Sequence, residues 1–112
     1  MKNKFTVLTL TNENFNQRVL ESVLPVLVLF CASWSGSSDI MVAILEELAR
    51  DFPGKAVFAK IDADEAHEIA RQFRIASIPT VLFFKQGVVD DRIVGVTSKN
   101  DLAQRLRALT DL

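Results

Sequence analysis

The chain has 112 residues, of which 49% are hydrophobic and 24% are charged. This length suits a single domain spanning residues 1–112, and the apolar fraction is large enough to form a core. The 13 basic and 14 acidic residues leave a net charge of -1. No basic surplus favours binding to a phosphate backbone, so nucleic acid is excluded as an expected partner.

The first third of the chain predicts a strand, a helix and a second strand. Residues 4–10 are rich in β-formers, which favours a strand. Residues 11–20 carry apolar side chains at helical spacing, and Thr11 or Asn12 can cap that helix. Residues 26–32 are continuously apolar, which is typical of a central strand covered on both faces.

Five further elements and a last helix follow from periodicity and turn signals. A long amphipathic helix is predicted between the polar turn at 33–38 and Pro53-Gly54. A strand at 56–61 and a short helix at 64–73 follow it. The chain then continues with strands at 80–85 and 92–96, joined through Gln86-Gly87, and with a helix after Ser98. Ser98 with Asp101 three residues later matches a capping box. The alternating first part requires parallel strands with crossover helices, and the hairpin adds antiparallel strands. We therefore expect an α/β fold with a mixed central sheet and helices on both faces.

The junction after the central strand is where a sheet of this kind places its chemistry. The sequence there is Trp-Ser-Gly-Ser-Ser, residues 34–38. This junction, Lys60-Ile61-Asp62 in the next strand, Ile78-Pro79-Thr80 and Phe84-Lys85-Gln86-Gly87 together resemble the thioredoxin family. The resemblance extends over nearly the whole chain and implies a thioredoxin fold.

Thioredoxins carry Trp-Cys-Gly-Pro-Cys at this junction. The first thiolate attacks a substrate disulfide and the second sulfur resolves the mixed disulfide. Both sulfur positions are serine here, at Ser35 and Ser38. A serine hydroxyl forms no disulfide and is a poor nucleophile without an adjacent base. The resemblance therefore implies a degenerate motif with no catalytic residues, so that the family's protein-disulfide oxidoreductase activity is not expected.

Residues around the motif also depart from the family pattern. Leu29 stands where the family has a buried acid, Ser37 replaces the proline between the cysteines, and Asp39 replaces a residue that is often basic. Ala43 replaces a proline of the following helix. An engineered trapping variant would differ only at the cysteines, so these further changes favour a natural relative without the redox function.

Pro79 matches the family's cis-proline, next to which the backbone pairs with an extended peptide. The resemblance implies a peptide-binding groove formed by Trp34, Ser35, Gly36, Ser37, Ser38, Ser77, Ile78, Pro79 and Gly95. An alternative is that Pro79 and Gly95 only preserve the fold. Trp34 is either a packing residue or an aromatic anchor for the partner. Ser37 and Ser38 are predicted to cap the long helix.

Cys31 is the only cysteine, so an internal disulfide is excluded and a reducing compartment is favoured. Residues 1–4 do not match a signal peptide. The longest apolar run, residues 23–32, is about half the roughly 20 residues that cross a bilayer. We therefore expect a cytoplasmic protein that does not associate with membranes.

Three functions remain open at this point. The first is a non-catalytic module that binds an unidentified protein or peptide through the former substrate groove. The second is a monothiol redox protein using Cys31 with an external resolving thiol, and the third is a subunit packed permanently in an assembly. We expect a slow, poorly reactive Cys31 thiol, and a monomer or weak dimer. No metal or cofactor is expected, because His67 has no partner at metal-ligand spacing and one cysteine supplies no zinc site.

Overall fold

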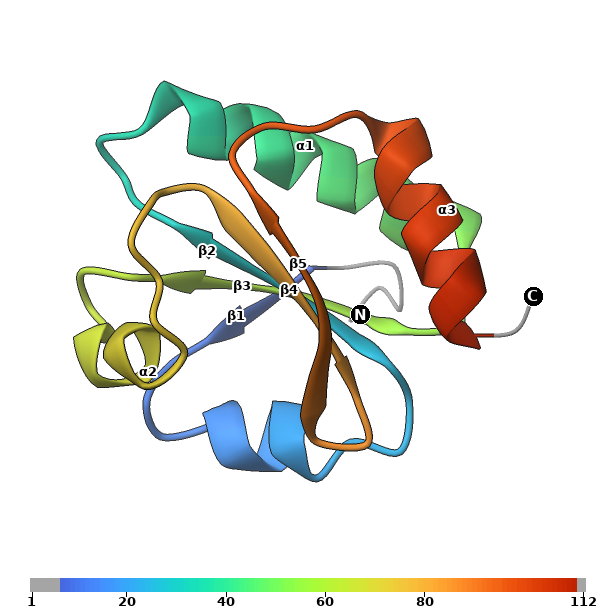
Figure 1. The fold of residues 1–112 in the computed structure, drawn as a ribbon, viewed down its shortest axis with the longest axis horizontal. Helices are drawn as coiled ribbons and strands as arrows, with labels where there is room; N and C mark the ends of the chain where they lie inside the picture. Colours follow the sequence, from blue (N-terminus) through green and yellow to red (C-terminus); the bar gives the residue numbers. More distant parts are fainter. Residues whose placement is uncertain (1–6, 111–112) are drawn as a thin grey trace, which may run out of the picture.

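A five-stranded mixed sheet forms the centre of the protein (Figure 1). The computed structural model describes residues 7–110. The strands are β1 (Leu8–Leu10), β2 (Val26–Cys31), β3 (Val57–Asp62), β4 (Thr80–Lys85) and β5 (Val88–Val94), in the order β1-β3-β2-β4-β5. β3 pairs in parallel with β1 and β2, whereas β4 is antiparallel to β2 and β5. This is the mixed α/β sheet expected from the sequence.

Helical segments cover both faces of the sheet (Figure 1). They are the π-helix η1 (Asn16–Leu20) and the α-helices α1 (Gly36–Asp51), α2 (His67–Gln72) and α3 (Lys99–Thr110). Apolar side chains of α1 and α3 pack on one face of the sheet, and those of η1 and α2 pack on the other. None of the helices described in residues 7–110 has the length and hydropathy to cross a membrane.

β2 lies at the centre of the sheet and is buried on both faces. Residues 26–30 are at most 1% exposed, because their side chains alternate between the two hydrophobic clusters. Leu29 belongs to the cluster under α1 and α3 and is 0% exposed. On the other face, the rings of Phe15, Phe73 and Phe84 meet at centroid distances of 5.3 to 5.9 Å. These two cores hold the end of β2, and with it the loop before α1, in a fixed position.

The hairpin differs from the prediction. β5 begins at Val88 and ends at Val94, whereas the sequence pattern predicted 92–96. Gln86 and Gly87 both have positive φ values, 52° and 80°. Such a two-residue turn matches the twist of the flanking strands, so pairing resumes directly after it. Two adjacent aspartates, Asp90 and Asp91, concealed the strand because they interrupt its apolar alternation.

The short second α-helix begins at His67, three residues later than predicted. The Asp62 carboxylate accepts hydrogen bonds from the backbone N–H groups of Asp64 and Glu65, which holds a turn there instead of a helix. The predicted first strand, 4–10, is only partly testable, because residues 4–6 lie outside the described part. Within it, β1 covers Leu8–Leu10.

Half of the predicted capping box before α3 is confirmed, because the Asp101 carboxylate accepts from Thr97 Oγ1–H and Arg105 Nε–H rather than from the N–H of Ser98. The backbone N–H of Asp101 donates to Ser98 Oγ at 3.0 Å. In the turn before η1, Asn14 N–H donates to Thr11 Oγ1 and Thr11 N–H donates to Asn14 Oδ1. Ser98 therefore caps α3 as predicted, whereas the N-cap of η1 is Phe15, which makes no side-chain cap bond. Thr11 stabilises the turn before η1 and does not cap that helix.

Candidate functional site

The loop between β2 and α1 is held by the two serines that occupy the family's cysteine positions. Ser35 is the N-cap of α1, with extended backbone angles, and its Oγ accepts the N–H of Ser38 at 3.1 Å. The Oγ of Ser38 accepts the N–H of Ala32 at 3.2 Å. Ser35 is 8% exposed and Ser38 is 2% exposed. Both hydroxyls therefore stabilise the loop as acceptors from backbone N–H groups.

This geometry corrects the predicted cap. Ser35 caps α1, rather than Ser37 and Ser38. Ser37 is half-buried, and its side chain makes no hydrogen bond within residues 7–110. The helix begins at Gly36, so only Ser35 has the non-helical backbone that an N-cap requires. Serine is a favoured N-cap residue, so all three nearby serines are candidates in the sequence, and only the structure distinguishes them.

We expect Ser38→Ala to lower the free energy of unfolding by about 1–3 kcal/mol, because it leaves the buried N–H of Ala32 without an acceptor. Ser37→Ala is the matched control, since that hydroxyl has no such bond, and its effect should stay within about 0.5 kcal/mol. Urea unfolding of the two variants measures both values. Equal stability of both variants would contradict a structural role for the Ser38 hydroxyl.

Among residues 7–110, no side chain accepts a hydrogen bond from the hydroxyl of Ser35 or Ser38. His67, the only histidine, is exposed on α2 rather than in the loop, as the sequence indicated. Within the described chain, no group of three or more His, Cys, Asp or Glu side chains is placed to hold a metal ion. The arrangement therefore lacks the nucleophile–base pair that serine catalysis needs.

Trp34 lies on the surface beside the loop. Its side chain is 69% exposed, and its Nε1 donates to Asp64 Oδ2 at 2.8 Å. Asp64 is itself fixed, because its N–H donates to Asp62 Oδ1 at 2.8 Å. The indole is thus oriented by a bond at its edge while most of its surface faces solvent. This arrangement leaves a large apolar surface free for contact with another molecule.

The segment before β4 lies at the same end of the sheet as this loop. Phe30, near the end of β2, pairs with Thr80, the first residue of β4. The Ile78–Pro79 peptide bond is cis, and the Pro79 carbonyl accepts the N–H of Gly95 at 2.8 Å. Neither the N–H nor the C=O of Ile78 forms a hydrogen bond within residues 7–110. A short length of backbone beside Pro79 is therefore free to pair.

Two further residues at this end were missed in the sequence. Val94 and Val96 are 60% and 52% exposed and lie on either side of Gly95. Val94 pairs with Thr80, which follows Pro79 directly. In the sequence, two valines on either side of a glycine only weakly indicate an exposed apolar surface. Their exposure follows from the position of β5 at the sheet edge, which the sequence does not give.

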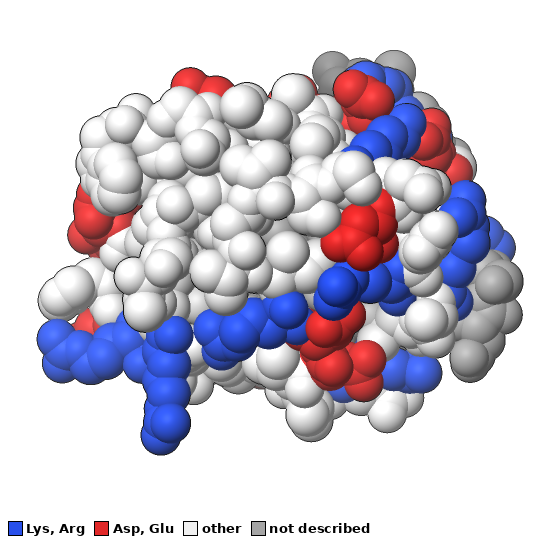
Figure 2. Space-filling view, turned by 45° about the horizontal axis from the view of Figure 1, so that its top comes forward, with Lys and Arg blue, Asp and Glu red and all other residues white. Residues whose placement is uncertain are grey.

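We call the exposed and half-buried apolar side chains at this end the apolar rim; they are Trp34, Ile78, Val94 and Val96. Figure 2 shows a broad area without charged side chains on the face that carries the β2–α1 and β5–α3 connections. The predicted residues Ser77, Ile78, Pro79 and Gly95 do come together around the start of β4. Ser77 contributes there through its carbonyl, which accepts Thr80 Oγ1–H at 2.8 Å.

Cys31 is the last residue of β2 and adjoins the N-terminal end of α1, since Ser38, Asp39 and Val42 line the same cavity. It is half-buried, packs against the core cluster of α1 and α3, and donates weakly to the Ile61 carbonyl at 3.5 Å. A cavity of about 320 Å³ adjoins it and is lined in part by Lys60, Asp62 and Asp39. Burial raises the pKa of the Cys31 thiol, and the Asp62 carboxylate raises it further, although Lys60 opposes the shift. The thiol is therefore mostly protonated at neutral pH.

We expect alkylation of Cys31 in the folded protein at pH 7 to be at least about tenfold slower than that of an unhindered thiol. The rate should rise with pH, because the reactive thiolate forms only as pH approaches the raised pKa. Labelling with a maleimide, with the urea-unfolded chain as the unhindered reference, measures the ratio. Equal rates for the folded and unfolded chains would contradict the protected thiol.

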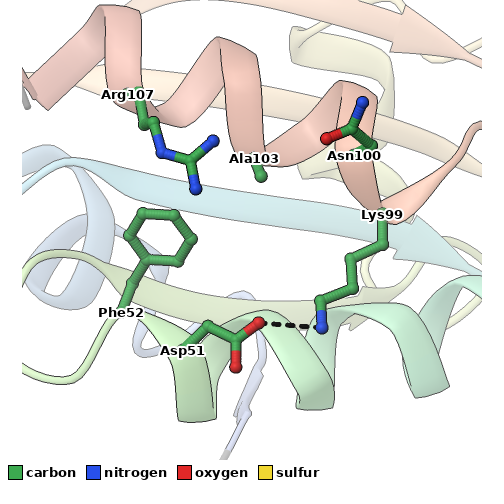
Figure 3. Close-up of a pocket in the computed structure, with 6 residues that line it drawn as sticks. All are labelled: Asp51, Phe52, Lys99, Asn100, Ala103 and Arg107. Carbon is green, nitrogen blue, oxygen red and sulfur yellow. Dashed lines mark ion pairs between the residues drawn. The ribbon is translucent and has the colours of Figure 1, made fainter.

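A larger cavity, of about 590 Å³, lies between the end of α1 and α3 (Figure 3). Lys99 points across it to Asp51, with an ion pair at 2.8 Å, and also pairs with Glu47 at 3.3 Å. Arg107 lies over the ring of Phe52, 5.4 Å from its centroid. The lysine charge is thus neutralised within the protein. The cavity is distant from the β2–α1 loop and contains no reactive group.

Comparisons with known proteins agree with this architecture. The family model described as Thioredoxin matches residues 6–108. The chain is 44% identical over 96 residues to the thioredoxin of Chlorobaculum thiosulfatiphilum, covering 86% of this chain and 89% of that protein. It is 39% identical over 100 residues to the thioredoxin of Staphylococcus haemolyticus (89% and 94% covered), and 40% identical over 95 residues to the chloroplastic thioredoxin M-type of Spinacia oleracea (85% and 52% covered). The family-model match and these relatives show that the chain belongs to the thioredoxin family, in which it combines a five-stranded mixed sheet with serine at both positions of the redox pair.

Proposed function

We propose that this thioredoxin-family protein is a non-catalytic binding module that holds an extended segment of a protein or peptide against the apolar rim. The observation that carries the proposal is the contrast within one site. The hydroxyls of Ser35 and Ser38 are both engaged with backbone N–H groups, while the neighbouring Trp34 indole remains 69% exposed. The Trp34 indole therefore offers a contact surface next to a loop whose two serines cannot form a disulfide.

The backbone of Ile78 supports the same proposal. Its N–H and C=O are unpaired within residues 7–110. The next residue, buried Pro79, bonds to half-buried Gly95, and exposed Val94 pairs with Thr80. An extended peptide can bond to such a free backbone pair and gain affinity from main-chain bonds, with side-chain pockets giving specificity. The groove proposed here comprises the apolar rim, the 35–38 loop, Ser77, Pro79 and Gly95.

A monothiol enzyme using Cys31 has weaker support. The thiol is half-buried, its pKa is raised by burial, and it packs against the core cluster of α1 and α3. We further propose that the protein acts in the cytoplasm as a monomer or weak dimer, without a metal or cofactor. A lone free thiol suits a reducing compartment.

Selection from a random peptide library, displayed on phage, tests the proposal. We expect wild-type protein to retain peptides whose dissociation constants, measured by fluorescence polarisation, rise at least about tenfold on Trp34→Ala, as for the central aromatic residue of an interface. Val94→Ala should also weaken binding. Val23→Ala is the matched control, because Val23 is 91% exposed but lies before β2, away from the rim.

Peptides that bind equally well to wild type, Trp34→Ala and Val94→Ala would contradict the proposed groove. The same selection distinguishes the peptide groove from a permanent structural subunit, because a large flat interface between folded proteins gives no enrichment of short linear peptides. Failure to enrich any peptide would therefore also reject the groove.

A further inference from the structure

Three arginines near the apolar rim have no acidic partner. Arg71 lies in the last turn of α2, Arg74 lies two residues after that helix, and Arg92 lies on β5; all three are exposed. None of them forms an ion pair within residues 7–110, where Lys99 and Arg105 each bind two carboxylates. We call these three residues the arginine cluster.

Arg92 joins the two elements that carry the cluster. Its Nη2 donates to the Phe73 carbonyl at 2.6 Å, and its Nη1 donates to the Arg74 carbonyl at 3.5 Å. The guanidinium is thereby fixed against the chain that leaves α2. Backbone carbonyls are neutral, so these bonds orient the guanidinium and leave its positive charge uncompensated.

The arginine cluster adjoins the apolar rim. Arg92 and Val94 are two residues apart on β5 and therefore point to the same face of the sheet. From Arg74, the chain runs four residues to Ile78, which is part of the rim. Figure 2 shows Lys and Arg side chains in a band along the lower border of the uncharged area, beginning on the side where α2 lies in Figure 1.

Carboxylates near the cluster offset only part of its charge. Glu68 is one turn before Arg71 on α2, and Asp90 is two residues before Arg92 on β5. Both are exposed, and neither forms an ion pair with a described residue. Asp91 is committed to Arg105, with Nη1 to Oδ2 at 3.0 Å. The three arginines of the cluster exceed these two exposed carboxylates by one charge, so a net positive charge remains beside Val94, while the Asp64 carboxylate lies at Trp34.

We propose that the partner of the rim is an acidic polypeptide segment, with an apolar stretch on the rim and Asp or Glu side chains next to it on the arginine cluster. This inference rests on the proposed function, because the rim must hold the apolar stretch. Arginine binds carboxylates bidentately, which makes it selective for them. Exposed charges of this kind act mainly on specificity and on the rate of association, and salt screens them.

The test uses the peptides selected by the wild-type protein from the random library. We expect Asp and Glu to be enriched on one side of the apolar stretch. The double variant Arg71→Gln/Arg74→Gln should raise the dissociation constant of these peptides about three- to tenfold. Arg92 is left in place, because its bonds to the carbonyls also hold the chain after α2.

Arg18→Gln/Arg50→Gln is the matched control. It removes the same charge from exposed arginines on η1 and α1, outside the cluster. The dissociation constants of peptides for this control variant should change less than about twofold, because salt screens exposed charges that lie far from the bound peptide. Raising KCl from about 50 mM to about 500 mM should weaken wild-type binding and nearly abolish the difference between wild type and the cluster variant. Circular dichroism confirms that each variant is folded.

Equal weakening by the two double variants would overturn the arginine cluster as the recognition element, since only total charge would matter. Selected peptides without an acidic bias would overturn it as well, even where Trp34→Ala abolishes their binding. That result leaves the proposed function intact, so the two failures are distinguishable. Peptides insensitive to Trp34→Ala would instead reject the rim, and the acidic partner with it.

Discussion

The double variant Ser35→Cys/Ser38→Cys is expected to reduce protein disulfides at least about a hundredfold more slowly than a thioredoxin with an intact Cys-Gly-Pro-Cys loop. Restoring the sulfur atoms does not restore proton transfer. Position 29 holds a leucine that is 0% exposed, where the family has its buried acid. General acid–base catalysis contributes roughly 10²–10⁴ in rate. Asp39, in the first turn of α1, further disfavours a thiolate nearby.

Reduction of a model disulfide protein with dithiothreitol as electron donor measures this activity. The matched control is the pair of single variants Ser35→Cys and Ser38→Cys, which cannot complete the cycle of attack and resolution. We expect the double variant to exceed them only slightly. Turnover equal to that of an intact thioredoxin would show that the surrounding residues still support the chemistry.

Leu29→Asp is expected to lower the free energy of unfolding by roughly 3–5 kcal/mol, from lost apolar packing and from burial of a polar group. Leu29 lies on β2 between Lys60 of β3 and Val81 of β4, within the core under α1 and α3. The position has become part of the hydrophobic core. The missing acid therefore cannot be replaced without a loss of stability, even with Lys60 in register beside it.

The loss of stability in the Leu29→Asp variant should depend on pH. Burial raises the pKa of the introduced carboxyl above its unfolded value, which is about 4. The variant is then most stable below that unfolded pKa and loses stability as pH rises through the folded pKa. Urea unfolding between about pH 4 and about pH 8 follows this difference from wild type. Leu29→Asn is the uncharged control, and its difference from wild type should be constant across the range.

Much of the fold could be predicted because its signals are local. Residues close in sequence determine the continuous apolar run at 26–32, the amphipathic stripe of α1 and the cap at Ser98. The same holds for the loss of the redox pair, which is a matter of residue identity at positions 35 and 38. Such features need no knowledge of the tertiary structure.

Other features depend on contacts between distant residues. Arg92 meets the carbonyls of Phe73 and Arg74 only because β5 and the end of α2 lie close together. The exposure of Val94 follows from its place on an edge strand. The choice of Ser35 as the cap depends on the point where α1 begins. These contacts determine the candidate binding surface, so the sequence could indicate the groove but not its rim.

Disulfide reduction by the wild-type protein decides whether any redox chemistry remains in it. With dithiothreitol as donor, we expect wild type and Cys31→Ala to give the same rate as dithiothreitol alone. Both serine hydroxyls are bound to the backbone, and the one thiol is protected. Turnover by wild type above that background, lost in Cys31→Ala, would contradict the account and establish a monothiol enzyme.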